Sequence, residues 1–174
     1  MVTGLIEGTM DRDLPFYFMQ IGKWLERAEK TMRMTLIILE QQKITGPSLH
    51  EMDGTFLLEL AAAKETFLQK HRQTNLLMVI RYLLQDEHFP CSIMFCLKKL
   101  EEALKSIEHD PLSSRCLTLH STIKSFVLAI DHHDFWSMSV EEAITIMEER
   151  LSQWIAFSET FSTIYHLYEP SIQP

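Results

Sequence analysis

The densest set of side chains that could take part in chemistry lies in one eleven-residue stretch. It consists of Lys23, Glu26, Arg27, Glu29, Lys30 and Arg33. Glu26 precedes Lys30 by four positions and Glu29 precedes Arg33 by four, an order in which each exposed ion pair supports a helix by about 0.2–0.5 kcal/mol. The stretch therefore fits a solvated helix face, or a polar seam that turns Lys23, Glu26 and Arg27 toward a neighbouring helix. Such a seam would fix geometry more reliably than it adds stability.

Outside this stretch, three features could carry chemistry. Arg12 comes just before a helix, where a cation is poorly placed for the helix dipole, so it lies either in solvent or against an anionic group. Cys91 lies near the start of a later helix, where a thiolate is favoured, but a catalytic cysteine also needs a positioned base and an oxyanion hole. His132 and His133 are adjacent and lack the spacing of a helical metal site. We predict no catalytic residue, no metal site and no cofactor.

Composition excludes several classes of protein. The chain has 174 residues and a formal net charge of −8, which indicates one domain and argues against a mainly electrostatic nucleic-acid binder. Its three cysteines form no CxxC pair, so we predict no disulfide framework and a cytoplasmic location. The N-terminus lacks the pattern of a secretory signal, and no apolar run approaches the ~18 residues of a membrane span.

Apolar residues at spacings of three and four predict an all-α protein, a single-domain bundle of five to six mostly antiparallel helices. The expected helices cover about 13–42, 49–71, 75–85, 90–108 and 111–130, and a last one begins at 139 and includes Tyr165. Asp13 should cap the first helix, and Ser139 with Glu142 forms a capping box for the last. The apolar residues expected to face inward are Phe56, Leu60, Ala63, Phe67 and Leu68 on the second helix and Ile93, Leu97, Leu100 and Leu104 on the fourth. The chain divides into an entry segment (1–12), a bundle (13–168) and a flexible tail (169–174).

Three segments of the sequence together resemble one known family. They are GLIEGTMDRDLPFYFMQIGKWLERAEKT from Gly4, FLLELAAAKETF from Phe56 and LLQDEHFPCSIMFCLKKLEEAL from Leu83. In their order and spacing they are similar to the bacterial alpha-E family, which is all-helical and has no established activity. The similarity extends over about residues 4–165, and it is mainly to the C-terminal half of longer members.

The resemblance also selects candidate site residues. The family pattern contains a "GTM-R" entry, a "GR-LERA" helix, a glutamate on the second helix and a serine after an "FP" bend. The polar-seam or ligand candidates that match it or lie beside the match are Arg12, Lys23, Glu26, Arg27, Glu65 and Ser92. The resemblance makes Glu65 a natural partner for Arg27 or Lys23 across the seam.

Three positions depart from the family pattern. Lys23 replaces an arginine, which keeps the charge but loses a bidentate fork. Cys91 also replaces an arginine and loses the charge, so Cys91 is not a catalyst that the family shares. Phe67 stands where the family has an aromatic residue with a hydroxyl.

The resemblance implies a functional setting as well. Family members are linked with ATP-grasp-type ligases and transglutaminase-like proteins, so the chain is expected to be a non-catalytic partner or accessory module in a peptide- or amide-bond-forming system. Two alternatives stay open. The chain could be an enzyme or a small-ligand-binding domain that uses the Lys, Glu and Arg cluster within the bundle, or it could be a structural dimerisation module. We expect the chain to bind a protein partner, which includes the possibility of a homodimer. We do not expect it to bind nucleic acid or a membrane.

Overall fold

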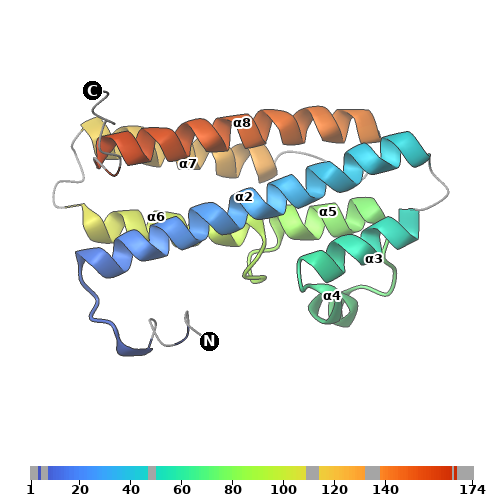
Figure 1. Ribbon diagram of the computed structural model, residues 1–174, viewed down its shortest axis with the longest axis horizontal. Helices are drawn as coiled ribbons and strands as arrows, with labels where there is room; N and C mark the ends of the chain where they lie inside the picture. The colour runs from blue at the N-terminus through green and yellow to red at the C-terminus, as the bar shows by residue number, and fades with distance from the viewer. Residues whose placement is uncertain are drawn as a thin grey trace, which may run out of the picture.

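The computed structural model describes residues 4, 8–46, 50–108, 114–131, 138–165 and 167. All regular elements within these residues are helices, which confirms the all-α class (Figure 1). In chain order they are α2 (Leu14–Thr45), α3 (His50–Leu60), α4 (Lys64–Lys70), α5 (Leu76–Gln85), α6 (Ile93–Ile107), α7 (Ser114–Asp131) and α8 (Val140–Ile164). The described residues therefore contain seven helices, and the predicted count of five to six was too low. His132, His133 and the tail 169–174 lie outside the described residues, and the division into segments stays a prediction.

Helix α2 is the element around which the others are arranged. It packs most extensively against α6 and α8, and it also contacts α3. Figure 1 shows α8 and α6 running antiparallel to α2 on its two sides, with α7 beside α8 and with α3 and α4 near the C-terminal half of α2. None of the helices in the described residues combines the length and the apolar character that crossing a membrane requires.

The ends of α2 follow from its sequence. The Asp13 side chain accepts a hydrogen bond from the Phe16 amide at 3.2 Å, so Asp13 is the predicted cap, and a proline lies in the first turn. At the other end, Gly46 adopts φ 80° and donates its amide to the Gln42 carbonyl. Glycine tolerates this backbone conformation without steric cost, so the helix ends at Gly46, a few residues beyond the predicted end at about 42.

The predicted second helix is wrong in two respects. It is two helices, because the chain turns at Ala62, which adopts φ 51°, and the Ala63 amide bonds back to the Leu58 carbonyl at 2.8 Å. This bond pattern closes a helix end that usually contains glycine, so no sequence signal announced it. Within α3 the inward side also differs from the prediction, since Phe56 and Leu60 are exposed while Leu57 and Leu58 are fully buried. Beyond the turn, Ala63 and Phe67 are buried as predicted, and Leu68 is exposed.

The remaining predicted helices are confirmed with small shifts at their ends. The fourth begins at Ile93 rather than near residue 90, because Ser92 accepts a hydrogen bond from the Phe95 amide and caps α6. Its four predicted inward residues are all buried. The capping box at the start of α8 is present, with Ser139 and Glu142 bonded reciprocally at 2.8 and 3.2 Å.

Candidate functional site

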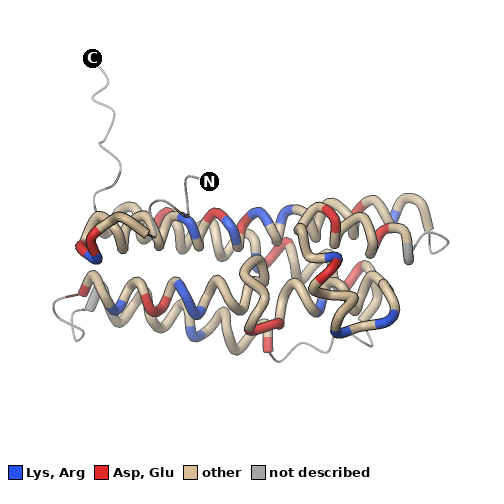
Figure 2. Tube along the Cα trace, turned by 90° about the horizontal axis from the view of Figure 1, so that it is seen from below, with Lys and Arg blue, Asp and Glu red and all other residues tan. Residues whose placement is uncertain are grey.

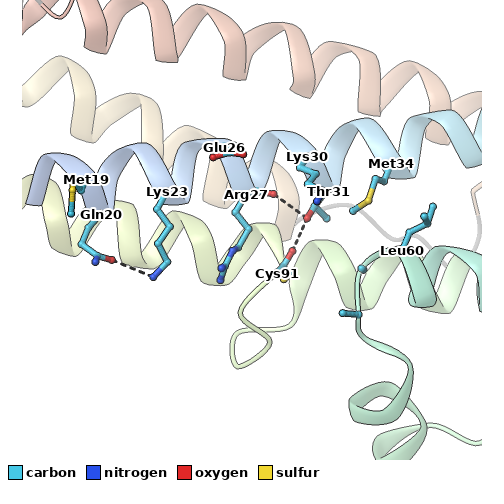
Figure 3. A pocket seen from close by; sticks show the side chains of 12 residues that line it. Met19, Gln20, Lys23, Glu26, Arg27, Lys30, Thr31, Met34, Leu60 and Cys91 are labelled. Atoms are coloured by element: carbon cyan, nitrogen blue, oxygen red, sulfur yellow. Dashed lines mark hydrogen bonds between the residues drawn. The ribbon is translucent and has the colours of Figure 1, made fainter. Parts of the chain in front are cut away.

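The charged stretch of α2 borders a groove of about 510 Å³. Four charged residues of α2 line it, namely Lys23, Glu26, Arg27 and Lys30. Residues 60–62, at the turn between α3 and α4, form another part of its wall, and Cys91 comes from the loop before α6 (Figure 3). We call the cavity bordered by these residues the α2 groove. It brings together three cationic side chains and one carboxylate, in a chain whose formal net charge is −8.

Helical spacing explains which charged residues of α2 face the groove and which lie on another side. Lys23, Arg27 and Lys30 are separated by four and three positions, so they share one face of the helix. Glu29 lies on another side, where it forms the predicted ion pair with Arg33 at 2.7 Å. Figure 2 shows basic and acidic positions interleaved along the bundle, which makes the grouping of cations at the groove a local feature.

Arg27 joins the groove to the rest of the fold. Its side chain is half-buried, and Nη1 donates a hydrogen bond to the Pro90 carbonyl at 3.2 Å. Its guanidinium carbon also lies 5.1 Å from the centre of the Trp24 ring, within the range of a cation–π contact. Arg27 therefore orients the loop before α6 and presents a charge to the groove at the same time.

Lys23 and Lys30 differ in how firmly they are held. The Lys23 ammonium lies 4.2 Å from the centre of the Trp24 ring and 3.5 Å from the Gln20 side-chain oxygen. Lys30 is exposed and forms no ion pair within the described part of the chain, so the expected Glu26–Lys30 pair is not formed. Figure 3 shows Lys23 and Arg27 pointing toward the Cys91 loop, while Glu26 lies at the far edge of the helix.

Buried Thr31 fixes the position of Cys91. Its hydroxyl lies 2.8 Å from the Cys91 carbonyl and 3.1 Å from the Arg27 carbonyl of its own helix. Because a hydroxyl donates one hydrogen, the shorter contact joins α2 to the loop. The Cys91 backbone is thus held at the groove by the residue one turn beyond Arg27.

Asp86 organises the loop that carries Cys91. One carboxylate oxygen accepts hydrogen bonds from the amides of His88 and Phe89, at 2.9 and 2.8 Å, and the other pairs with the Lys70 ammonium at 2.7 Å. Burial alone would raise the pKa of Asp86, but these bonds to the charged form outweigh it and lower the pKa. The loop is therefore a constrained structure built on an ionised aspartate.

Three buried side chains contact this loop, namely Ser92, Cys96 and Tyr82. Ser92 is fully buried, caps α6 and donates its hydroxyl hydrogen to the Asp86 carbonyl, so this site candidate is a structural cap. The Cys96 thiol lies 3.8 Å from the Pro90 carbonyl, and burial raises its pKa to about 12. Burial, followed by the nearby charge of Asp86, likewise raises the pKa of Tyr82 to about 12.

The remaining candidates lie outside the α2 groove. Arg12 is exposed, with its guanidinium carbon 4.1 Å from the centre of the Phe16 ring, and it lines a separate hollow that Lys99 borders. Glu65 is exposed in the first turn of α4 and does not line the groove, while Arg27, its expected partner, bonds to Pro90 instead. Within the described residues, no group of three His, Cys, Asp or Glu side chains could hold a metal ion.

Sequence reasoning missed the part of the groove that comes from outside α2. Leu60 and Ala62 line it because the chain turns between α3 and α4, and neither glycine nor proline marks that turn. Thr31 could have been found, since it follows Arg27 by four positions and must lie on the same face.

The fold and the groove define an all-helical bundle whose long helix carries a Glu-Arg pair at the edge of a cavity. A family model matches residues 1–165, and its description reads "Alpha-E: A predicted alpha-helical domain with a conserved ER motif". The chain belongs to this family, which confirms the resemblance. The sequence contains a second Glu-Arg pair, Glu149–Arg150 on α8, whose side chains lie 3.7 Å apart. No curated protein and no solved structure matched the chain.

Proposed function

We propose that this alpha-E protein is a non-catalytic binding module whose α2 groove holds an acidic peptide segment. The observation that carries the proposal is the convergence of Lys23, Arg27 and Lys30 on one cavity of a chain with a net charge of −8. Such a local excess of cations attracts carboxylates and disfavours cationic partners.

The chemistry of the groove supports a peptide as its occupant. The lysine and arginine side chains are donors for carboxylates, and an arginine fork can bind a carboxylate through two hydrogen bonds. Glu26 borders the groove from the far edge of the helix, where it is an acceptor for an amide or an ammonium group at the rim, while Met19 and Met34 give the groove apolar walls. The volume of about 510 Å³ lies within the usual range of ligand sites, and half of the twelve residues that line the groove are polar or charged, more than in a typical small-molecule pocket.

Binding without catalysis is favoured by what lines the groove. Among the described residues that line the groove, Cys91 is the only one with a thiol, and none is a histidine that could act as a base for that thiol. The resemblance implies an association with ATP-grasp-type ligases and transglutaminase-like proteins, and this implication is our reason for proposing a setting in which peptides are joined through amide bonds. We therefore propose that the protein is a partner or accessory module that holds a carboxylate-bearing peptide for such an enzyme.

The direct test is the binding of a fluorescently labelled hexaglutamate peptide, measured by anisotropy. We expect wild type to bind it and the Lys23→Glu/Lys30→Glu variant to lose about tenfold or more in affinity, because two attractive charges become repulsive. The matched control is Lys98→Glu/Lys105→Glu, which changes the net charge equally on α6, outside the groove. The control should change the affinity less than twofold.

Two outcomes would overturn this proposal. One is that wild type does not bind hexaglutamate, and the other is that the control variant loses as much affinity as the groove variant. Free glutamate serves as a further arm: if it competes as well as the peptide at equal concentration, the groove is a small-molecule site rather than a peptide site.

A further inference from the structure

An apolar face on α3 continues outward from the α2 groove. Met52, Phe56 and Leu60 follow one another at intervals of four residues, so they lie along one side of the helix, and their exposed fractions lie between 45% and 69%. A helix in a globular protein normally turns such a line toward the core. The core-facing side of α3 is already occupied by other residues, namely Leu57 and Leu58.

A second apolar line begins at the same groove and continues along α2. Lys23, Lys30, Ile37 and Ile44 are separated by seven residues, or nearly two turns, so they share one edge of the helix. This edge is cationic at Lys23 and Lys30 and becomes apolar beyond them, with Ile37 and Ile44 exposed by 59% and 85%. The change occurs where the α2 groove ends.

The two lines begin at the same groove. Leu60 and Lys30 line the same cavity, and Leu60 is the last member of the α3 line. From there α3 leads back alongside α2, which it contacts, toward the C-terminal end of α2 (Figure 1). We call the surface of α2 and α3 that carries these two lines the strip: its apolar residues are Ile37 and Ile44 on α2 and Phe56 and Met52 on α3, and it is cationic where Lys23 and Lys30 line the groove.

A strip that is apolar along two helices and cationic at one end fits a partner that is apolar along one side and acidic at one end. We infer that the strip between α2 and α3 receives the apolar side of an amphipathic helix from a partner protein, whose acidic C-terminal end enters the α2 groove. The inference rests on the proposed function and specifies its ligand. The direction follows from charge, because the C-terminus of a helix is the negative end of its dipole and is favoured next to cations. The span from Met52 to Leu60 is eight residues, about 12 Å of helix, so the partner contributes about two turns to the strip.

The test starts from a displayed library of random 15-residue peptides with free C-termini. We expect enriched peptides to carry apolar residues three and four apart and acidic residues in the last turn. An enriched peptide should bind wild type with at least tenfold higher affinity than a control peptide. In the control, lysine replaces the acidic residues of the last turn and the C-terminus is amidated. No enrichment, or enrichment without this pattern, would overturn the inference.

Protein variants separate this inference from the proposed function. Ile37→Ser/Phe56→Ser should weaken binding of the enriched peptide at least tenfold and leave hexaglutamate binding unchanged. The matched control is Leu117→Ser/Leu128→Ser, which removes comparably exposed leucines from α7 and should change neither affinity. If the strip variant binds the enriched peptide as well as wild type, the inference fails while the proposed function stands. If light scattering shows that wild type is a dimer that this variant dissociates, a second copy covers the strip and the inference is wrong.

Discussion

Helices α3 and α6 both pack against α2, but they use their apolar residues in opposite ways. Helix α6 buries its whole apolar line, from Ile93 to Leu104, against the core. Helix α3 buries two adjacent leucines and leaves a separate line of large apolar residues exposed. Helix α6 is thus amphipathic in the ordinary sense, whereas α3 is apolar on two sides.

The difference indicates which part of the bundle serves stability and which part is available for binding. Helix α6 buries its apolar line in the core, so this line is not accessible to a partner. The exposed line of α3 contributes little to the core, so the fold does not require it. Exposed apolar residues that form a continuous line are typical of interaction surfaces, which is the basis for assigning the strip to a partner helix.

The most direct test of this difference between α3 and α6 is to replace one leucine of each helix by alanine and compare the losses of stability. Leu97 of α6 is fully buried, whereas Leu60 of α3 is 45% exposed. Leu97→Ala should lower the free energy of unfolding by about 2–5 kcal/mol, because it removes buried surface and leaves a cavity. Leu60→Ala should lower it by less than about 1 kcal/mol. Urea unfolding followed by circular dichroism measures both, and equal losses would mean that Leu60 belongs to the core.

The segment before α6 and the segment after α3 also differ in what stabilises them. The charge of Asp86 in the first should have the larger effect on stability. The loop before α6 is built on ionised Asp86, while the turn after α3 is closed by backbone bonds, with an exposed ion pair between Glu59 and Lys64 across it. Asp86→Asn keeps an acceptor for the amides of His88 and Phe89 but loses the charge that pairs with Lys70. We expect a loss of about 1–2 kcal/mol in the free energy of unfolding at pH 7.

The sign of the pH dependence follows from the lowered pKa of Asp86. The unfolded chain takes up the proton first as pH falls, so the stabilisation is complete above about pH 4–5 and is lost as pH falls through the lower pKa of the folded state. The difference between wild type and Asp86→Asn, measured by urea unfolding at several pH values, should therefore shrink toward pH 3. A difference that stays constant over this range would show that Asp86 acts through geometry and not through its charge.

Periodicity in the sequence could predict α6 and not α3, for a physical reason. A helix with a single apolar line has only one side to bury, so the spacing from Ile93 to Leu104 determines its orientation. With apolar residues on two sides, spacing cannot say which side meets the core, and the prediction chose the side that contains Phe56. The cations of the groove were predictable because they share one face of α2. Ala62 reaches the groove through a turn that no local signal announces, and the loop of Cys91, although marked by the Phe89-Pro90 bend, is brought to the groove by contacts with α2 that the sequence does not show.

The smallest expected effect concerns the turn that ends α3 and separates it from α4. Ala62 adopts φ 51°, a conformation that costs a residue with a Cβ about 1–3 kcal/mol, so Ala62→Gly should raise the free energy of unfolding by about 0.5–1 kcal/mol. The control is Ala61→Gly, one residue earlier and buried, where the helix still makes its bond from the Ala61 amide to the Leu57 carbonyl. Glycine there should lower the free energy of unfolding by about 1 kcal/mol. Opposite signs for these neighbours in urea unfolding would confirm that α3 ends at this turn, and a loss in both would mean that the helix continues through it as periodicity predicted.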